Sequence, residues 1–411
     1  MTFLNLRTFS SLGNRDYRYY FGTVTLQTTA MYMQTIVRSL LVYRITGSVA
    51  LLGTVALISA LPEIVLSLFG GVLADRIPKK LVLIFGQTAY AIASLIVAVC
   101  ITVGYISPEH PESWWVLAVT AFFRGGVLGI VMPSRQAIIS ELVGSDLLMN
   151  ALSINNLVRN VSRLFSPALA GILIDTVGFE AVYYIMTVMY VLAILLTLPL
   201  PLTGTAKKGT RITNPFIEIR DGLKYVWREN ILFSILVLTM FITLLSSPYM
   251  QLLAVFTDDI LGVGATGLGV LVSASGAGAM VGTLILASLP NRRRGLMLFI
   301  SGAILGMALA GFSFSSIWLL SLALMTIIGF GQTGRMLLSN ALLQSYSEES
   351  YRGRVMSIYL MESGISTVGV FFAAILAEGV GVQWAVGSLS IMLLTGCVLG
   401  IFFQPRVRHL D

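Results

Sequence analysis

Long stretches of apolar residues without a single charged side chain dominate the pattern along this chain. Each of them reaches or exceeds the roughly 20 residues that a helix needs to cross the hydrocarbon core of a bilayer. The uncharged stretches are 81–108, 181–206, 230–257, 260–291, 295–334 and 379–405. The pattern therefore predicts an all-α membrane protein.

Segments that carry isolated charges bring the total to twelve predicted membrane-spanning helices, six in each half of the chain. The first six are 17–43, 50–73, 81–105, 114–140, 147–174 and 180–201. The second six are 230–257, 266–289, 295–313, 316–344, 352–377 and 383–404. We therefore expect an N-terminal six-helix bundle over 1–202 and a C-terminal one over 230–411, joined by a cytoplasmic linker over 203–229.

The linker is the only long polar stretch of the sequence. In its second part, apolar residues such as Ile219, Leu223 and Trp227 recur at helical spacing, with basic and acidic residues on the other faces. This pattern predicts an amphipathic helix at the inner membrane surface. A calmodulin-type target helix is the alternative.

The two halves of the sequence also echo each other. Ser153 and Ile154 match Ser357 and Ile358 under a shift of 204 residues, and Ala137 matches Ala341 under the same shift. Two duplicated six-helix halves are a transporter design, in which the substrate binds near the bilayer midplane and the halves rock alternately.

The composition and the charge distribution agree with this topology. Hydrophobic residues make up 56% of the chain and charged residues only 11%. Most of the 26 Lys and Arg residues fall on one side of the predicted spans, which the positive-inside rule assigns to the cytoplasm together with both termini. The net charge of +7 is then a topology signal in the cytoplasmic membrane, and we expect no nucleic-acid partner.

Side chains that enzymes use for metal or nucleophilic chemistry are scarce. Both histidines, His110 and His409, lie outside the predicted spans, and the two cysteines, Cys100 and Cys397, lie in apolar runs of opposite halves. No Walker-type Gly-Lys-Ser/Thr sequence occurs. We expect no enzymatic activity, no metal and no cofactor, so a concentration or proton gradient must drive transport.

Ionisable residues within the predicted spans are costly, so they face the bundle interior or a wet cavity. They are Arg38, Glu63, Arg124, Arg135, Arg159, Arg163, Arg335 and Glu362. Six arginines against two glutamates favour an anionic substrate. Glu63, directly after Pro62, is a candidate proton carrier or one half of a permanent salt bridge. Glu362 and Arg335 are placed to pair, as a structural bridge or, with Arg124, as coupling residues.

One face of the fifth predicted span is strongly polar. Asn156, Arg159 and Arg163 recur there at three- and four-residue steps, and such a face cannot point at lipid. Together with Arg38 we interpret it as the wall of a substrate cavity, with internal packing as the alternative. Arg135, near the inner end of the fourth span, is assigned to the cytoplasmic gate.

The sequence Gly70-Gly71-Val72-Leu73-Ala74-Asp75-Arg76-Ile77-Pro78-Lys79-Lys80 joins the second and third predicted spans. It resembles the signature found at this place in the major facilitator superfamily, whose members are transporters with two pseudo-symmetric six-helix halves. The resemblance implies that Asp75 binds the start of helix eleven, near 351–354, and stabilises the outward-open state. Gly71, Asp75 and Arg76 then form the inner gate with Arg135.

Two further sequences resemble one branch of that family, which includes the enterobactin exporter and the macrolide efflux proteins. They are Leu41-Val42-Tyr43-Arg44-Ile45-Thr46-Gly47-Ser48 and Met132-Pro133-Ser134-Arg135-Gln136-Ala137. The chain departs from the family's proton-antiporter pattern at two places, because Ser166 replaces a glycine before Pro167 and the usual glutamine near Arg124 is missing.

These features predict a monomeric secondary transporter that exports a small amphipathic organic compound, anionic and siderophore- or drug-like, by proton antiport. Its partners are this small-molecule substrate, protons and the lipid bilayer. A facilitator that imports a nutrient or metabolite is the first alternative. A membrane enzyme or receptor built on the same helices is the second.

Overall fold

The computed structural model describes residues 9–202, 215–289 and 292–410, and within these ranges it leaves the side chains of 68–76 and 215–219 undescribed. The described chain is almost entirely helical and contains no β-strand. The α-helices are α1 (Arg15–Thr46), α2 (Val49–Arg76), α3 (Lys79–Thr102), α4 (Trp114–Thr197), α5 (Pro215–Arg228), α6 (Asn230–Ser246), α7 (Pro248–Val255), α8 (Gly264–Ser288), α9 (Arg294–Ser313), α10 (Trp318–Tyr346), α11 (Arg352–Leu360), α12 (Glu362–Val380), α13 (Val382–Phe403) and α14 (Pro405–Arg408). Three short helical turns of other types are η1 (Ser10–Gly13), η2 (Pro111–Ser113) and η3 (Phe256–Ile260).

The long helix α4 consists of three rods. Gly144, with φ 68°, and Gly178, with φ 84°, interrupt it in the left-handed region, which glycine adopts without the steric cost of a Cβ atom. We call the resulting segments rod A (114–143), rod B (145–177) and rod C (179–197). Three of the predicted membrane-spanning helices therefore correspond to this one element.

Every span predicted from the sequence coincides with a helix or rod, with ends that differ by a few residues. Rods A to C are the fourth to sixth spans, the seventh combines α6, α7 and η3, and the eleventh combines α11 and α12. Eight continuous helical stretches of the described residues are long and apolar enough to cross a membrane, and one of them, Pro111–Thr197, contains all three rods. The all-α membrane architecture is confirmed.

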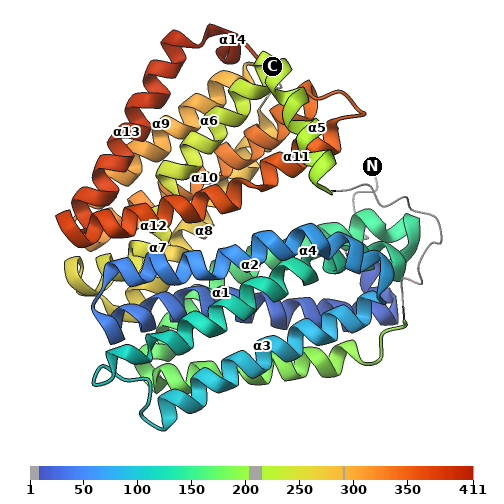
Figure 1. The fold of residues 1–411 in the computed structure, drawn as a ribbon, viewed down its shortest axis with the longest axis vertical. Helices are drawn as coiled ribbons and strands as arrows, with labels where there is room; N and C mark the ends of the chain where they lie inside the picture. Colours follow the sequence, from blue (N-terminus) through green and yellow to red (C-terminus); the bar gives the residue numbers. More distant parts are fainter. Residues whose placement is uncertain (1–8, 203–214, 290–291, 411) are drawn as a thin grey trace, which may run out of the picture. The chain divides into compact units, whose positions relative to one another are not determined.

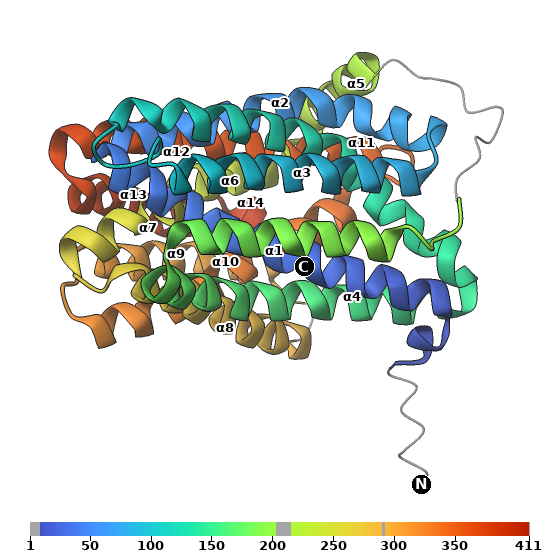
Figure 2. The same cartoon turned by 90° about the horizontal axis from the view of Figure 1, so that it is seen from below.

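Contacts between Cα atoms divide the chain into two units. Unit 1 comprises residues 1–46 and 58–212, and unit 2 comprises 47–57 and 213–411. Within unit 1, α1 and α3 pack along the rods of α4 (Figures 1 and 2). Within unit 2, α10 packs against α8 and α9, and α13 packs against α9.

A very close helix crossing recurs at equivalent places in the two units. A Cβ atom on Gly125 of rod A would lie 1.8 Å from the carbonyl oxygen of Ser59 in α2. A Cβ atom on Gly329 of α10 would lie 1.8 Å from the carbonyl oxygen of Ser275 in α8. The two glycines are 329 − 125 = 204 residues apart, the same shift at which the sequence repeats itself. Only glycine permits such an approach of two helix backbones.

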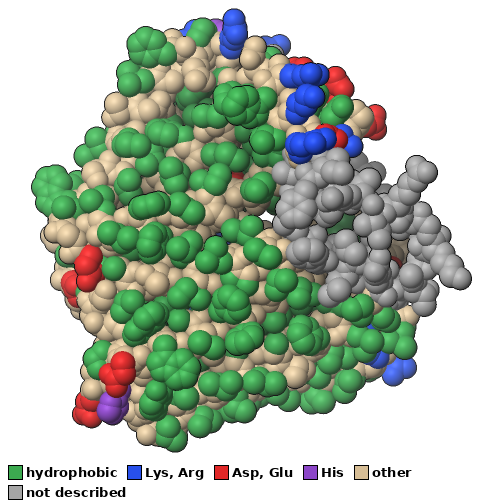
Figure 3. Space-filling view, viewed as in Figure 1, with side chains coloured by type: hydrophobic (Ala, Val, Ile, Leu, Met, Phe, Trp, Pro, Cys, Tyr) green, Lys and Arg blue, Asp and Glu red, His purple; other side chains and the backbone are tan. Residues whose placement is uncertain are grey.

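Large apolar side chains cover the outside of the helices. Phe123 and Phe165 are both 62% exposed and Leu319 is 74% exposed. Figure 3 shows hydrophobic side chains over the visible face of both units, with charged side chains at its margins. An apolar exterior of this extent is typical of a protein whose solvent is lipid.

Candidate functional site

Three arginines surround a small cavity in unit 1. The cavity has a volume of about 200 Å³ and lies between α1, rod A and rod B. Its lining consists of Thr28, Met31, Tyr32, Thr35, Arg124, Met132, Arg135, Gln136 and Arg159. We call it the arginine cavity, and its lining includes no carboxylate.

Helical periodicity explains how the first two elements supply these side chains. On α1, Thr28, Tyr32 and Thr35 follow one another at steps of four and three residues, so they share one face. On rod A, Arg124 and Arg135 are 135 − 124 = 11 residues apart, close to three helical turns at 3.6 residues per turn. Both arginines therefore face the same side of rod A.

Arg135 is the most buried of the three arginines, at 6% exposure. Its Nη2 donates a hydrogen bond of 2.5 Å to the hydroxyl of Thr28, and its backbone carbonyl accepts one of 2.7 Å from the hydroxyl of Tyr20. Its Nε is buried without a hydrogen-bond partner among the described residues, and so is the Nε of Arg159. Each of these two guanidinium groups thus keeps one buried donor that no group of the described residues uses.

The charge of the arginine cavity follows from this set of side chains. Guanidinium groups cannot be deprotonated under physiological conditions, so Arg124, Arg135 and Arg159 contribute three positive charges. Like charges around one cavity repel each other, and a bound anion removes that repulsion and supplies acceptors. The arrangement suits a carboxylate, a catecholate or another small anionic group.

Glu63 and Arg38 lie close to this site without lining the cavity. Glu63 is half-buried on α2, and Arg124 and Arg38 are the charged groups that act on its carboxylate. Among the described residues it forms no ion pair with either arginine. Arg38 is 9% exposed, and its Nη1 has no hydrogen-bond partner among those residues. Within the described part of the chain, Glu63 is therefore a carboxylate with opposite charge nearby but with no fixed partner.

The other residues of the polar face on rod B lie apart from the cavity. Asn156 is exposed and Arg163 is half-buried, and neither lines the arginine cavity. The structure groups Arg159 with Arg124 and Arg135 instead. The roles assigned to all these residues from the sequence stay predictions.

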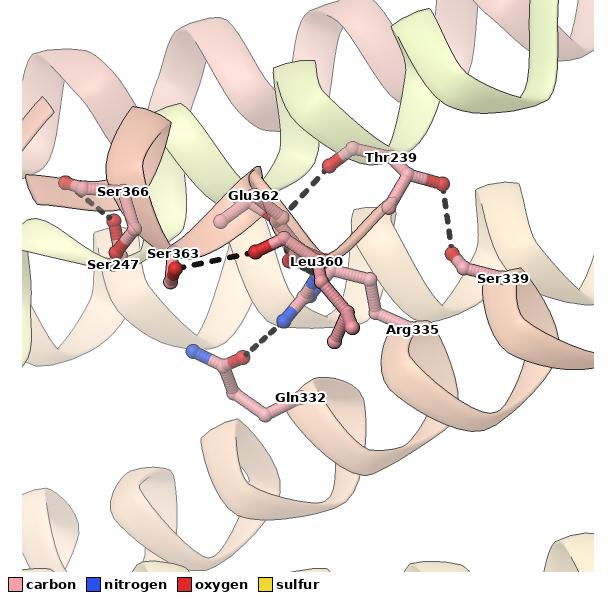
Figure 4. Close-up of polar contacts among 10 residues, drawn as sticks. Thr239, Ser247, Gln332, Arg335, Ser339, Leu360, Glu362, Ser363 and Ser366 are labelled. Atoms are coloured by element: carbon pink, nitrogen blue, oxygen red, sulfur yellow. Dashed lines mark hydrogen bonds and ion pairs between the residues drawn. The ribbon is translucent and has the colours of Figure 1, made fainter. Parts of the chain in front are cut away.

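In unit 2, the ion pair that the sequence suggested is present. The guanidinium of Arg335 on α10 pairs with the carboxylate of Glu362, the first residue of α12, and both side chains are largely buried, at 11% and 13% exposure. Thr243 on α6 donates its hydroxyl hydrogen to the same carboxylate oxygen, and its own oxygen lies 2.5 Å from Arg335. Figure 4 shows Arg335 reaching from α10 toward Glu362, with Gln332 beside it. Three helices thus meet at one carboxylate.

This ion pair borders a larger hollow of about 800 Å³ within unit 2. Hydroxyl and amide side chains are frequent in its lining, among them Ser246, Ser247, Gln332, Asn340, Gln344, Ser363 and Ser366. Because Arg335 and Glu362 neutralise each other, the hollow presents neutral hydrogen-bonding groups. Its chemistry therefore differs from that of the arginine cavity.

Gly71, Asp75 and Arg76, which the sequence analysis predicts to form the inner gate, belong to the last turns of α2, in the stretch whose side chains lie outside the described residues. The adjoining start of α3 is described. Lys79 forms an ion pair with Glu141 of rod A, and Lys80 donates to the carbonyl oxygens of Leu198 and Leu200 at 2.5 and 2.7 Å. These contacts attach the start of α3 to rod A and to the segment after rod C.

Sequence reasoning missed Thr28, Tyr32 and Gln136 in the arginine cavity and Thr243 at the ion pair. For α1 a signal exists, since Thr28, Tyr32 and Thr35 form a polar stripe at helical spacing within a predicted span. For Thr243 no such signal exists, because a single threonine in an apolar span is common. Within the described ranges, no group of three or more His, Cys, Asp or Glu side chains is placed to hold a metal ion.

Known proteins resemble this chain over most of its length. The staphyloferrin A transporter of Staphylococcus aureus (strain NCTC 8325 / PS 47) is 25% identical over 357 residues, 86% of each chain. The enterobactin exporter EntS of Salmonella typhi is 25% identical over 337 residues, 81% of this chain and 78% of that protein. Macrolide efflux protein A of Streptococcus pyogenes is 22% identical over 375 residues, 89% of this chain and 90% of that protein.

Structure comparison gives the same fold. The crystal structure of the nucleoside transporter NupG matches with a TM-score of 0.74 at 13% sequence identity, covering 97% of this chain and 100% of that one. The sequence-family model of the Major Facilitator Superfamily matches this chain over residues 20–361 and 252–411. The family resemblance and the expectation of a transporter rather than an enzyme are both confirmed. This chain is a multi-pass membrane transporter of the Major Facilitator Superfamily.

Proposed function

We propose that this transporter exports a small amphipathic organic anion from the cytoplasm in exchange for protons. One observation carries the choice of an anion: Arg124, Arg135 and Arg159 line one cavity that contains no carboxylate, and two of them keep a buried, unused Nε. A cationic cargo would meet three like charges there. An anionic group would instead receive charge-assisted hydrogen bonds, which are among the stronger ones in proteins.

The size of the cavity indicates how the cargo binds. A volume of about 200 Å³ lies below the roughly 300 to 1,000 Å³ of pockets that enclose a whole drug-sized ligand. The arginine cavity therefore takes the charged end of the cargo, such as a carboxylate or a catecholate. The direction of transport rests on relatives that are named as an exporter of enterobactin and a macrolide efflux protein.

Glu63 is the better candidate for the proton carrier. It is half-buried, has no ion-pair partner among the described residues, and experiences the charges of Arg38 and Arg124. Glu362 is held by Arg335 and Thr243 at the same time. A carboxylate without a fixed partner gains and loses a proton at a smaller structural cost than one that ties three helices together.

The chain works as a monomer in the cytoplasmic membrane with both termini inside, and its halves alternate between inward and outward access. Asp75, Arg76, Gly71 and Arg135 form the inner gate, while Arg38, Asn156 and Arg163 extend the substrate path beyond the arginine cavity.

Transport by purified protein in liposomes tests the cargo. The assay follows a tricarboxylate, a catecholate and the cationic dye ethidium. We expect the anions to be transported and Arg159→Gln to raise their KM by about tenfold to a hundredfold, because a hydrogen bond to a charged group contributes about 1.5–3 kcal/mol. Arg18→Gln removes an exposed arginine of α1 as the matched control. Transport of ethidium alone would contradict the proposal.

A pH-sensitive dye inside the same liposomes tests proton coupling. Glu63→Gln should abolish cargo-driven proton movement, whereas Glu362→Gln should lower protein stability and leave coupling in the surviving protein. Equal proton movement in wild type and Glu63→Gln would remove Glu63 from the mechanism. Accumulation of the anion in cells that make the protein, instead of its depletion, would favour the importing facilitator.

A further inference from the structure

The linker helix α5 is docked onto the start of α11 through one of its faces. A Cβ atom on Gly222 would lie 3.0 Å from the Cβ of Arg354, so the two backbones approach closely at this glycine. The rings of Tyr225 and Tyr351 stack in parallel, with centroids 4.2 Å apart and planes at 10°. Val226, on the same side of α5, is 2% exposed. α5 and α11 are in contact and lie beside each other in Figure 1.

The contacts of Tyr225 reach the residues just before α11. The hydroxyl oxygen of Tyr225 accepts a hydrogen bond of 3.2 Å from the backbone N–H of Glu348. Tyr351, its stacking partner, is the N-cap residue of α11, and the guanidinium of Arg354 lies over the Tyr351 ring at 5.1 Å. α5 therefore holds the first turn of α11 and the segment that precedes it.

The opposite side of α5 combines basic and apolar side chains. At 100° per residue, Leu223, Trp227, Arg220, Lys224 and Arg228 occupy one continuous arc of the helix, and all five are exposed. Leu223 is 47% and Trp227 69% exposed. Basic residues beside a Leu and Trp pair form the arrangement with which a helix lies in a membrane interface.

The position of Trp227 places this arc at the membrane surface. Its ring packs against Phe233, with centroids 5.8 Å apart, and Phe233 lies in the first turn of α6. α6 opens the membrane-spanning stretch Asn230–Ile260. Tryptophan is enriched at this boundary between headgroups and acyl chains. The basic side chains of α5 are then at the level of lipid headgroups.

Among the described residues, neither Lys224 nor Arg228 forms an ion pair, and Arg220 lies 3.6 Å from the neighbouring Asp221. Three exposed carboxylates lie in the adjoining segments: Glu229 directly follows α5, and Glu348 and Glu349 precede α11. We propose that the arc formed by Arg220, Leu223, Lys224, Trp227 and Arg228 docks anionic phospholipid headgroups of the membrane, and that the docked lipid holds α5 against the start of α11.

Binding of lipids to the purified full-length protein tests the docking step. The protein in detergent is titrated with phosphatidylglycerol or phosphatidylcholine, and bound lipid is counted by native mass spectrometry. Each basic residue near an anionic surface strengthens binding by roughly fivefold. We expect Arg220→Gln/Lys224→Gln/Arg228→Gln to weaken phosphatidylglycerol binding by at least about tenfold.

The control variant Arg15→Gln/Arg18→Gln/Arg406→Gln loses the same charge from exposed positions on other helices. It should bind phosphatidylglycerol more tightly than the α5 variant does. Equal binding of the two lipids by the wild type, or equal phosphatidylglycerol binding by the wild type and the α5 variant, would overturn the proposal.

Hydrogen exchange of the segment 348–358 tests the coupling to α11. In the wild type we expect slower exchange with phosphatidylglycerol than with phosphatidylcholine. Tyr225→Leu removes the ring stack but none of the basic residues, so it should keep the lipid and lose the slower exchange. Exchange that is the same in both lipids, or unchanged by Tyr225→Leu, would contradict the second half of the proposal. Neither readout involves the cargo.

Discussion

The carboxylate of Glu378, near the end of α12, accepts a hydrogen bond of 2.6 Å from the backbone N–H of Val49, the first residue of α2. The same oxygen accepts a second bond of 2.9 Å from the N–H of Ala50, and the other carboxylate oxygen accepts one of 3.2 Å from the hydroxyl of Ser48. The first backbone N–H groups of a helix have no partner within it, so Glu378 caps α2 from another helix. The whole contact lies within unit 2.

Removing this cap should destabilise the protein measurably. We expect Glu378→Ala to lower the free energy of unfolding by about 1–2 kcal/mol, the usual cost of losing a helix N-cap. Thermal unfolding in detergent measures the change. Glu112→Ala, an exposed glutamate that pairs with His110, should leave the midpoint within the experimental error. Equal midpoints for both variants would show that the cap contributes nothing.

The two glycine crossings predict a second stability effect. Gly125→Ala or Gly329→Ala would bring a methyl group to 1.8 Å from a carbonyl oxygen, so the helices must move apart. Overpacking of this kind costs about 1–3 kcal/mol. Gly379→Ala in α12 is the matched control, because a Cβ there meets nothing within 4 Å and alanine favours the helix. Its melting temperature should be unchanged or higher. A crossing variant that melts like this control would show that the helices adjust freely.

A double-mutant cycle tests whether the ion pair between Arg335 and Glu362 stabilises the protein. Arg335→Met or Glu362→Met alone leaves one buried charge unpaired, which typically costs about 3–5 kcal/mol. The double variant Arg335→Met/Glu362→Met removes both charges and should recover most of the lost stability. Stability is measured by thermal unfolding. If the double variant lost as much stability as the two single variants together, the ion pair would not be stabilising.

Cysteine labelling in intact cells tests the topology. The two native cysteines, Cys100 and Cys397, are first replaced by alanine. A membrane-impermeant maleimide should then label Glu109→Cys, which lies between α3 and rod A, but should label Arg18→Cys only after the cells are opened. Both positions are exposed, so the labelling depends only on the side of the membrane from which the maleimide reaches them. Labelling of Arg18→Cys from outside would reverse the proposed orientation.

The sequence was sufficient to predict the spans and the pairing of Arg335 with Glu362, but not the groups that meet in the arginine cavity. The length of an uncharged run can be compared directly with the length of helix that crosses the membrane. Gly144 and Gly178 interrupt α4 where the predicted spans end. That Arg124 and Arg135 share one side of rod A also follows from their spacing. Their meeting with Arg159 depends on how rod B packs against rod A, which no local pattern contains.

The same limit applies to capping between distant helices. The sequence places Glu378 on the outer side of the membrane, but its partners are backbone groups 329 residues away along the chain at Val49. Backbone donors carry no sequence signature, since every residue except proline has one. The stacking of Tyr225 on Tyr351 is equally invisible, because both aromatic rings lie outside the regular apolar pattern of the spans.

The three guanidinium groups of the arginine cavity have a practical consequence for any binding measurement. Three guanidinium groups attract every small anion in solution, including chloride and phosphate from the buffer, before they discriminate between organic cargoes. The apparent affinity for a cargo must therefore fall as inorganic anions are added, even when the protein itself is unaltered. For the proposed export from the cytoplasm, cytoplasmic phosphate and chloride would compete with the cargo for the three guanidinium groups.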